Sequence, residues 1–117
     1  MSGRMSRTKG RTAERAVEVM FQDAGYSTDR NIGGRTQVSG DISVASPPLA
    51  IEVRRRETLS IPRWMEDHAA SCPPHVIPVL TTKQNRKPWL VTMELSDFLD
   101  LLGREPASDN TANKEKG

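Results

Sequence analysis

The fold is decided by Gly40-Asp41-Ile42 and, across a short turn, Ile51-Glu52-Val53-Arg54. We interpret these segments as two adjacent strands, joined by a tight connection at Ser46-Pro47-Pro48. Successive side chains of a strand point to opposite faces, so Glu52 and Arg54 share one face of the second strand. An acid and a base therefore project from the same side of this predicted hairpin.

The pairing of the two strands determines what lies beside Glu52. We expect Asp41 to lie across from Arg54, which places Ser43 across from Glu52. In this register Asp41 and Glu52 are diagonal neighbours, roughly 7–8 Å apart at the backbone and within reach of one shared ion. A slip of one residue would send them to opposite faces. Alternatively, Asp41 is an ordinary turn residue and Glu52 lies on a solvated strand face.

Two carboxylates that converge on one point repel each other, and a divalent cation is the usual remedy. Two oxygen donors without a neighbouring His or Cys suit Mg²⁺ or Mn²⁺ better than zinc. A fixed positive charge beside such an ion suits phosphate chemistry. The sequence therefore predicts a Mg²⁺ or Mn²⁺ site on the hairpin.

The composition indicates one domain, since the chain has 117 residues. No run approaches the ~20 apolar residues of a membrane span, and the basic N-terminus lacks the apolar core of a signal peptide. The single cysteine, Cys72, excludes an intrachain disulfide and a cysteine-based zinc site. We expect a cytoplasmic protein without membrane contact.

Positive charge is clustered, although the formal net charge is only +2. Basic clusters around an acidic pocket fit a polyanionic substrate. Solvated loops are the alternative for each cluster. The candidate contacts to a polyanion fall in three clusters, at the start of the chain, after Glu52 and further on: Arg7, Lys9 and Arg11; Arg55 and Arg56; and Lys83, Arg86 and Lys87.

The first helix is predicted from Thr12 to a stop at Gly25, after a flexible basic arm at residues 1–10. Glu14 falls at the edge of the apolar stripe of this helix. It either looks into a cleft or complements the helix dipole in the first turn.

The rest of the chain alternates between strand and helix patterns. A second helix follows Ser60 and ends at Pro73-Pro74, and a third is capped by Ser96 and ends at Gly103. Residues 104–117 lack apolar periodicity and are expected to be a disordered tail. Strands are expected at residues 26–30, 38–45, 49–55, 76–80 and 89–93. The strand at 76–80 is a nearly continuous apolar run, which predicts burial on both faces, and residues 83–87 are expected to form a basic loop.

Residues 6–10 (SRTKG), Glu14, Gly40-Asp41 and Ile51-Glu52-Val53-Arg54 together resemble the PD-(D/E)xK nuclease superfamily. Within it, the likeness is to archaeal-type Holliday-junction resolvases and their small phage relatives. The resemblance covers about residues 6–102. It implies an α/β fold, with one restriction-endonuclease-like domain at residues 11–103 and a mixed five-stranded sheet flanked by helices (order αβββαββα).

The resemblance also implies a Mg²⁺-dependent (or Mn²⁺-dependent) endonuclease that cuts DNA in a bacterium or a phage-infected host cell. In the family's picture Asp41 and Glu52 bind the ion, aided by the Val53 carbonyl, and Glu14 completes the shell directly or through water. The ion lowers the pKa of a bound water and neutralises charge on the phosphate. The basic clusters contact DNA.

The implied substrate is branched DNA such as a four-way junction. Symmetric cutting of two strands needs two sites related by a two-fold axis, which implies a homodimer. Trp64, Met65 and Trp89 are available as apolar surface for that contact.

One position departs from the family pattern, because Arg54 stands where the family motif ends in lysine. Arginine stays protonated and cannot act as a base, but it can clamp a phosphate. Retention of Glu14, Asp41 and Glu52 favours an active nuclease, whereas Arg54 favours an inactive nuclease-fold protein that binds nucleic acid or a protein partner. A restriction-like or repair nuclease acting on linear duplex is a third interpretation.

Overall fold

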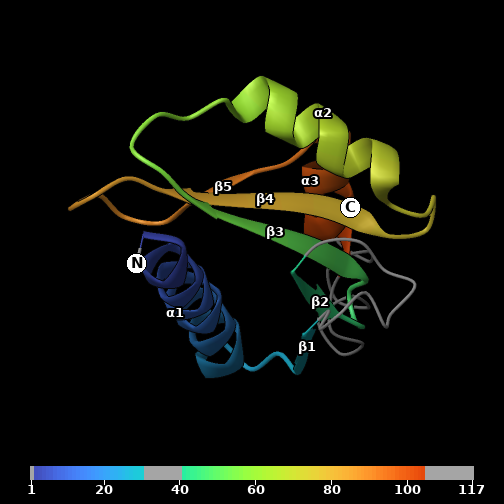
Figure 1. Cartoon of the computed structure of the whole chain (residues 1–117). Coiled ribbons are helices and arrows are strands. Elements are labelled where there is room, and N and C mark those ends of the chain that lie inside the picture. The colour runs from blue at the N-terminus through green and yellow to red at the C-terminus, as the bar shows by residue number, and fades with distance from the viewer. Residues whose placement is uncertain (1, 31–40, 105–117) are drawn as a thin grey trace.

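A mixed five-stranded sheet with helices on both faces forms the protein (Figure 1). The computed structural model describes residues 2–30 and 41–104, with side chains described from Thr12 onward in the first helix. The sheet order is β1-β2-β3-β4-β5; β3 and β4 are parallel and the other neighbours are antiparallel. The predicted α/β class and the order αβββαββα are confirmed. The elements are α1 Ser2–Asp23, β1 Thr28–Arg30, β2 Ile42–Val44, β3 Leu49–Arg55, α2 Ile61–Ser71, β4 Ile77–Lys83, β5 Leu90–Thr92 and α3 Leu95–Gly103.

The first helix is longer than predicted. It begins at Ser2 and not at Thr12, so residues 2–10, for which we expected a flexible arm, are helical. The apolar stripe that we used to place its start is absent before Thr12, but Arg, Lys and Met are good helix formers, and one interior glycine costs only ~1 kcal/mol. The expected tail at residues 104–117 lies outside the described residues except for Arg104.

The strand predictions hold best in the middle of the sheet. Strand β3 has the predicted bounds, and β4 is buried on both faces as its apolar run indicated. β4 continues to Lys83, which we had placed in a loop. β1 and β5 are shorter than predicted. Of the expected strand at residues 38–45, residues 38–40 lie outside the described part.

Of three predicted helix ends, one is wrong and two agree with the structure. Ser96 does not cap α3, because Glu94 holds the N-cap position and Ser96 lies within the first turn. Ser60 is at the N-cap of α2, as predicted, but its side chain makes no capping hydrogen bond. Glycine at position 25 has φ +102, which agrees with its predicted role in ending α1.

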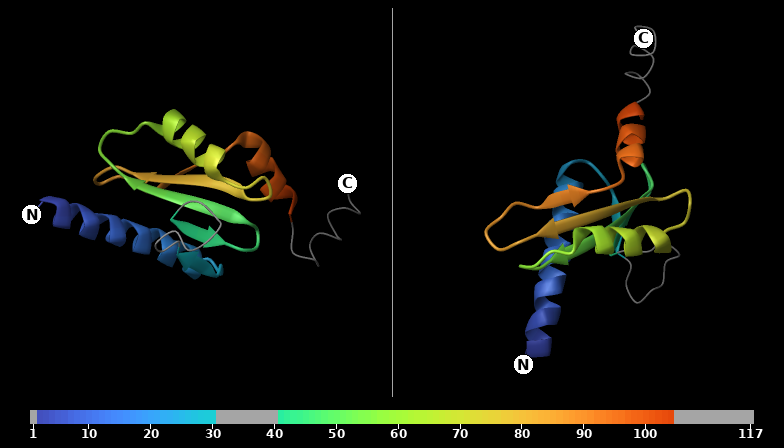
Figure 2. Two further views of the ribbon diagram at one scale, coloured as in Figure 1. Left: turned by 45° about the vertical axis from the view of Figure 1, so that its right-hand side comes forward. Right: turned by 90° about the horizontal axis from the view of Figure 1, so that it is seen from above.

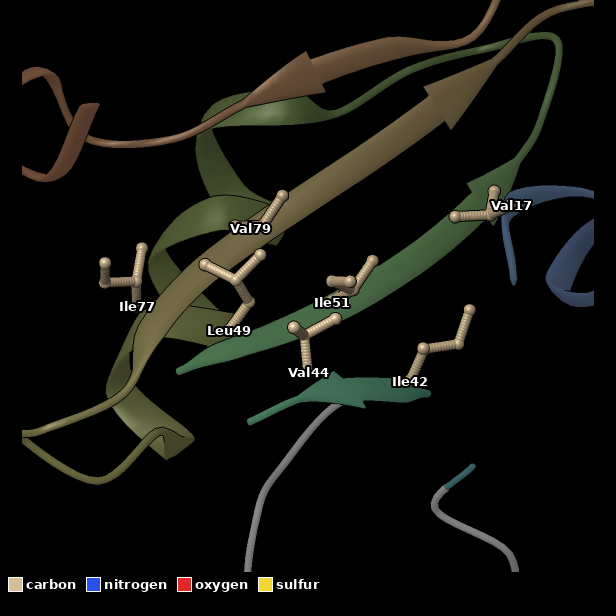
Figure 3. Close-up of a cluster of buried hydrophobic side chains, with 7 residues drawn as sticks. All are labelled: Val17, Ile42, Val44, Leu49, Ile51, Ile77 and Val79. Carbon is tan, nitrogen blue, oxygen red and sulfur yellow. The ribbon is translucent and has the colours of Figure 1, made fainter. Parts of the chain in front are cut away.

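The core lies between α1 and the sheet (Figure 3). Alternate residues of β3 point to α1, since the side-chain period of a strand is two. Partly buried side chains, among them Leu101 of α3, pack around the core. The opposite sheet face carries α2, and Figure 2 shows α3 projecting beyond the β5 edge. The buried core side chains are Val17, Ile42, Val44, Leu49, Ile51, Ile77 and Val79.

No helix within residues 2–30 or 41–104 has the length and apolar character needed to cross a membrane.

Candidate active site

Asp41 comes opposite Glu52 at the point where β2 begins. The ladder pairs Ile42 with Ile51, and the Asp41 amide donates to the Ile51 carbonyl over 2.8 Å. The predicted register was therefore wrong by two residues. Proline cannot donate to a strand ladder, so the turn takes residues 45–48 instead of closing on the two prolines. The shift is even, so every side chain keeps its predicted face.

The Asp41 carboxylate is anchored to the backbone of β3. Its Oδ2 accepts a hydrogen bond from the Val53 amide over 2.9 Å, just beyond the last backbone bond between β2 and β3. In an extended strand the N–H and C=O of one residue point to the same side. The Val53 carbonyl therefore faces the side on which Asp41 lies.

Glu52 is flanked by two basic side chains on the α2 face of the sheet. Arg54 Nη2 lies 3.1 Å from Glu52 Oε2, and His68 Nδ1 lies 3.9 Å from Glu52 Oε1. The other ring nitrogen of the buried His68, Nε2, donates to the Ala50 carbonyl over 2.8 Å. The Arg54 guanidinium also lies 5.3 Å from the centroid of the Trp64 ring, a cation–π contact. Arg54 is thus already fixed beside Glu52.

Glu14 reaches the site from α1 and is held by a residue that the sequence reasoning missed. Arg30 of β1 donates to Glu14 Oε1 over 2.6 Å and, through its other terminal nitrogen, to Glu18 Oε1 over 3.2 Å. Thr28 donates to the second oxygen of the buried Glu18 over 3.1 Å. Arg15, one turn before Glu18, completes the network at 3.2 Å. The spacing of Glu14 and Glu18, one helical turn apart, was the signal available in the sequence.

The carboxylates of the site repel one another. Burial and then the Asp41 charge raise the pKa of Glu52, against the lowering effects of Arg54 and His68. Burial and then Asp41 likewise raise the pKa of Glu14, against the lowering effect of Arg30. The Asp41 charge therefore raises the pKa of both glutamates, although Glu14 lies on α1 and Glu52 on β3. An added cation would relieve this repulsion.

The donor atoms suit a hard divalent cation, since Asp41, Glu52, Glu14 and the Val53 carbonyl offer only oxygen. Within the described residues, no three His, Cys, Asp or Glu side chains are grouped closely enough to form a finished metal site. Instead, Glu14 is paired with Arg30, and Glu52 is paired with Arg54. The residues fit the ion by type, and its binding would draw the glutamates from these arginines.

A cavity of about 210 Å³ lies beside Glu52, between β3 and α2. Arg54 and Trp64 line one part of it, and Asp67, His68 and Ser71 line the rest. The site is therefore open on the α2 side.

Two of the three basic clusters are joined in space. β3 and β4 place Arg55 beside Lys83, with like charges on neighbouring strands, and the Arg56 amide donates to the Lys83 carbonyl over 3.1 Å. Arg55 points to the face opposite Arg54, as predicted. Like charges directly opposite each other are unfavourable unless an anion lies between them.

Glu57 ties the β3–α2 connection to the β4–β5 turn. Its side chain accepts a hydrogen bond from the Asn85 amide over 2.5 Å, and its carbonyl accepts one from the Gln84 side chain over 2.8 Å. Arg86, in the same turn, has a φ of +62, a conformation that is uncommon for a residue other than glycine. We call the surface formed by Arg55, Arg56, Lys83, Arg86 and Lys87 the basic ridge.

The third cluster lies on the N-terminal half of α1. Arg7, Lys9 and Arg11 fall on helical backbone, but their side chains are outside the described part of the structure. The structure therefore gives no contacts for them.

The family described as "Phage putative PDDEXK endonuclease" matches residues 5–115 of the sequence. The chain belongs to this endonuclease family. No curated protein matches it. The fold of the endonuclease is similar to the solved structure of Hjc from Archaeoglobus fulgidus, a Holliday junction resolvase from an archaeal hyperthermophile. The TM-score is 0.54 at 24% identity, over 73% of this chain and 72% of that one.

These comparisons confirm the predicted superfamily and the restriction-endonuclease-like fold. They identify the protein as a nuclease. At this level of identity the likeness to Hjc bears on the fold of the endonuclease and not on its substrate.

Proposed function

We propose that this endonuclease hydrolyses DNA phosphodiesters with Mg²⁺ or Mn²⁺ held by Asp41, Glu52, the Val53 carbonyl and Glu14. The observation that carries the proposal is the position of Asp41 opposite Glu52, with the Val53 amide fixing one oxygen of Asp41. Half-buried carboxylates that repel each other are costly unless they serve a cation. A bound divalent ion would supply a Lewis acid that activates water and offsets charge on the phosphate.

The other residues of the site have roles that follow from their contacts. Arg54 lies beside Glu52 and cannot take up a proton, so it acts as an electrostatic clamp on the phosphate. Arg30 is a positioning residue, because it holds Glu14 and does not itself face Glu52. His68 orients Glu52 from α2 while its other nitrogen is bound to the Ala50 carbonyl.

We further propose that the substrate is branched DNA, with a four-way junction as the leading candidate. The basic ridge begins on β3 directly after Glu52 and Arg54, so a backbone that enters the site also meets the ridge. Symmetric cutting requires a homodimer. Such an enzyme would act in the cytoplasm of a bacterium or a phage-infected cell.

The proposal is tested by incubating the full chain with end-labelled four-way junction, flap and plain duplex DNA of matched sequence. Each substrate is tested with Mg²⁺, with Mn²⁺ and with a chelator. We expect paired cuts in the junction that require the metal. Equal cutting of duplex would favour a restriction-like or repair nuclease instead. Cleavage that persists in chelator would refute the metal assignment.

A second candidate is a nuclease-fold protein that binds nucleic acid or a protein partner without cutting. The observation in its favour is Arg54, which takes the place of the motif lysine and is engaged with both Glu52 and Trp64. If wild-type protein binds junctions but cuts none of the substrates, while Arg54→Lys cuts, this second candidate is correct.

A further inference from the structure

Two buried polar atoms on paired residues of β3 and β4 lack a hydrogen-bond partner. They are Nε of Arg54 and Oγ1 of Thr82. The parallel ladder pairs Arg54 directly with Thr82, so both side chains project from the α2 face of the sheet. Both atoms are closed to solvent, so water does not take the place of a protein partner. A buried polar group without a hydrogen bond is costly and requires an explanation.

The hydroxyl group of Thr82 has no use in the observed arrangement. Thr82 is 0% exposed, and its Oγ1 contacts no donor or acceptor. The neighbouring Thr81 shows the contrast, because its hydroxyl donates to the Glu52 carbonyl over 2.9 Å. Valine has nearly the shape of threonine and no polar side-chain atom, so it would fill position 82 at least as well. The Thr82 hydroxyl therefore indicates an interaction that forms in another position of Arg54.

Two contacts hold Arg54 in its present position. Its Nη2 lies 3.1 Å from Glu52 Oε2, and its guanidinium lies 5.3 Å from the centroid of the Trp64 ring. A divalent cation bound by Glu52 would displace the first contact, because the cation and the arginine carry charge of the same sign. It would not displace the second, since a cation–π contact depends on the charge above the ring and not on one particular nitrogen.

We propose that Thr82 is a positioning residue for Arg54, and that its hydroxyl accepts a hydrogen bond from Arg54 Nε once a cation at Glu52 has displaced the guanidinium. This inference rests on the proposed metal-dependent function. The bond satisfies both unpaired atoms at once, and it leaves the terminal nitrogens of Arg54 free to bind phosphate oxygens. Trp64 keeps the guanidinium in place during the exchange. Thr82 itself touches neither the ion nor the DNA.

A third unpaired atom shows that the match of donor and acceptor is particular to this pair. Within the described part of the chain, Nε of Arg55 is also buried without a partner. Arg55 lies on the opposite face, however, and the residue paired with it is Lys83. A lysine side chain only donates hydrogen bonds, so it cannot satisfy the Arg55 Nε. Thr82 has the acceptor that Lys83 lacks.

The first test is the binding of Mn²⁺ to the full chain without DNA, measured by titration calorimetry. Thr82→Val should bind Mn²⁺ roughly 3- to 10-fold more weakly than wild type, because one hydrogen bond no longer offsets the release of Arg54 from Glu52. Thr82→Ser keeps the hydroxyl and should bind the ion more tightly than Thr82→Val. The matched control is Thr92→Val, the same change on β5, which should bind Mn²⁺ like wild type.

Urea unfolding without metal separates this role from a structural one. Thr82→Val should be as stable as wild type or more stable, because it removes a buried hydroxyl that has no partner. Thr81→Val should be less stable, since the Glu52 carbonyl loses the hydrogen bond from this hydroxyl. A metal-free Thr82→Val variant that is clearly less stable than wild type would show that the hydroxyl already serves the fold, and this would overturn the proposal.

The third test is a double-mutant cycle on Mn²⁺ affinity. In an Arg54→Ala chain, Thr82→Val should no longer change the affinity, because Nε is absent. An effect of the same size with and without Arg54 would overturn the proposal. If wild type binds Mn²⁺ and cuts DNA while Thr82→Val binds the ion equally well, this inference fails and the proposed function stands. A wild type that binds no Mn²⁺ would overturn both.

Discussion

The Val53 amide donates a hydrogen bond to Oδ2 of Asp41 over 2.9 Å, so a side chain takes over where the backbone ladder between β2 and β3 ends. The bond fixes the carboxylate at the strand edge, where its charge raises the pKa of both Glu14 and Glu52. It also leaves the Val53 carbonyl on the same side. A short segment of backbone thereby orients the oxygen donors of the candidate site.

Asp41→Asn should abolish cleavage while DNA binding stays intact or becomes tighter, because a charge that repels phosphate is removed. It should also abolish the rise in melting temperature that Mn²⁺ gives to wild type. Saturation of one site at a hundred times its Kd stabilises a fold by about 2.7 kcal/mol. Ser43→Ala, on the same face of β2, is the control and should keep both properties. Normal cleavage by Asp41→Asn would show that the site is wrongly assigned.

Arg54→Ala should slow single-turnover cleavage by roughly 10²–10³-fold, as loss of one transition-state donor typically does. Arg54→Lys should keep much of the activity, since a positive charge remains beside Glu52. Arg55→Ala is the matched control: it lies on the opposite face, so it should weaken DNA binding without slowing cleavage at saturating DNA. The clamp role fails if Arg54→Ala cuts as fast as wild type.

Neutralising Lys83, Arg86 and Lys87 with glutamine should weaken DNA binding and flatten its salt dependence. Each lost phosphate contact lowers the slope of log affinity against log salt by about one. The measurement is a titration of labelled DNA at several salt concentrations. Arg63→Gln, an exposed change on α2, should leave the slope unaltered. An unchanged slope in the triple variant would mean that these residues are only solvated.

Glu57→Ala should weaken DNA binding even though it removes a negative charge beside the basic ridge. The loss of the hydrogen bond to the Asn85 amide frees the β4–β5 turn from the β3–α2 connection. Glu57→Gln removes the same charge but keeps an acceptor oxygen, so it should bind as tightly as wild type or more tightly. Equal effects of the two variants in the same titration would show that the charge of Glu57 matters, and not its hydrogen bond to the Asn85 amide.

Protonation of Glu18 should make the fold less stable as the pH falls. Burial alone would raise its pKa, but hydrogen bonds from Thr28, Arg15 and Arg30 outweigh burial and lower it below 4.5. A carboxylate whose pKa is lowered by folding contributes stability that is present above pH 4.5. This stability is lost as the pH falls through the pKa of the folded state.

Glu18→Gln should therefore cost roughly 1–3 kcal/mol near neutral pH, and the difference from wild type should shrink below pH 4.5. Urea unfolding at one protein concentration and a series of pH values measures it. Glu66→Gln, an exposed change on α2, should stay within about 0.5 kcal/mol of wild type throughout. A difference that does not vary with pH would mean that the ionised carboxylate is not what stabilises the network.

The sequence alone determined the elements at the centre of the sheet. The bounds of β3 and the burial of β4 follow from apolar patterns within each segment, and these depend only on near neighbours in the chain. The facing of Glu52 and Arg54 follows in the same way from the period of two. Acids spaced in the family's order were enough to indicate the superfamily.

The tertiary structure decided everything that depends on contacts between distant residues. The register of Asp41 against Glu52 was determined by a turn in which two prolines cannot donate hydrogen bonds. The pairing of Glu14 with Arg30 arises only when β1 packs beside α1. Because Leu101 of α3 packs on the core, the other large apolar side chains of this helix are exposed, and periodicity cannot distinguish a stripe that faces the core from one that faces solvent.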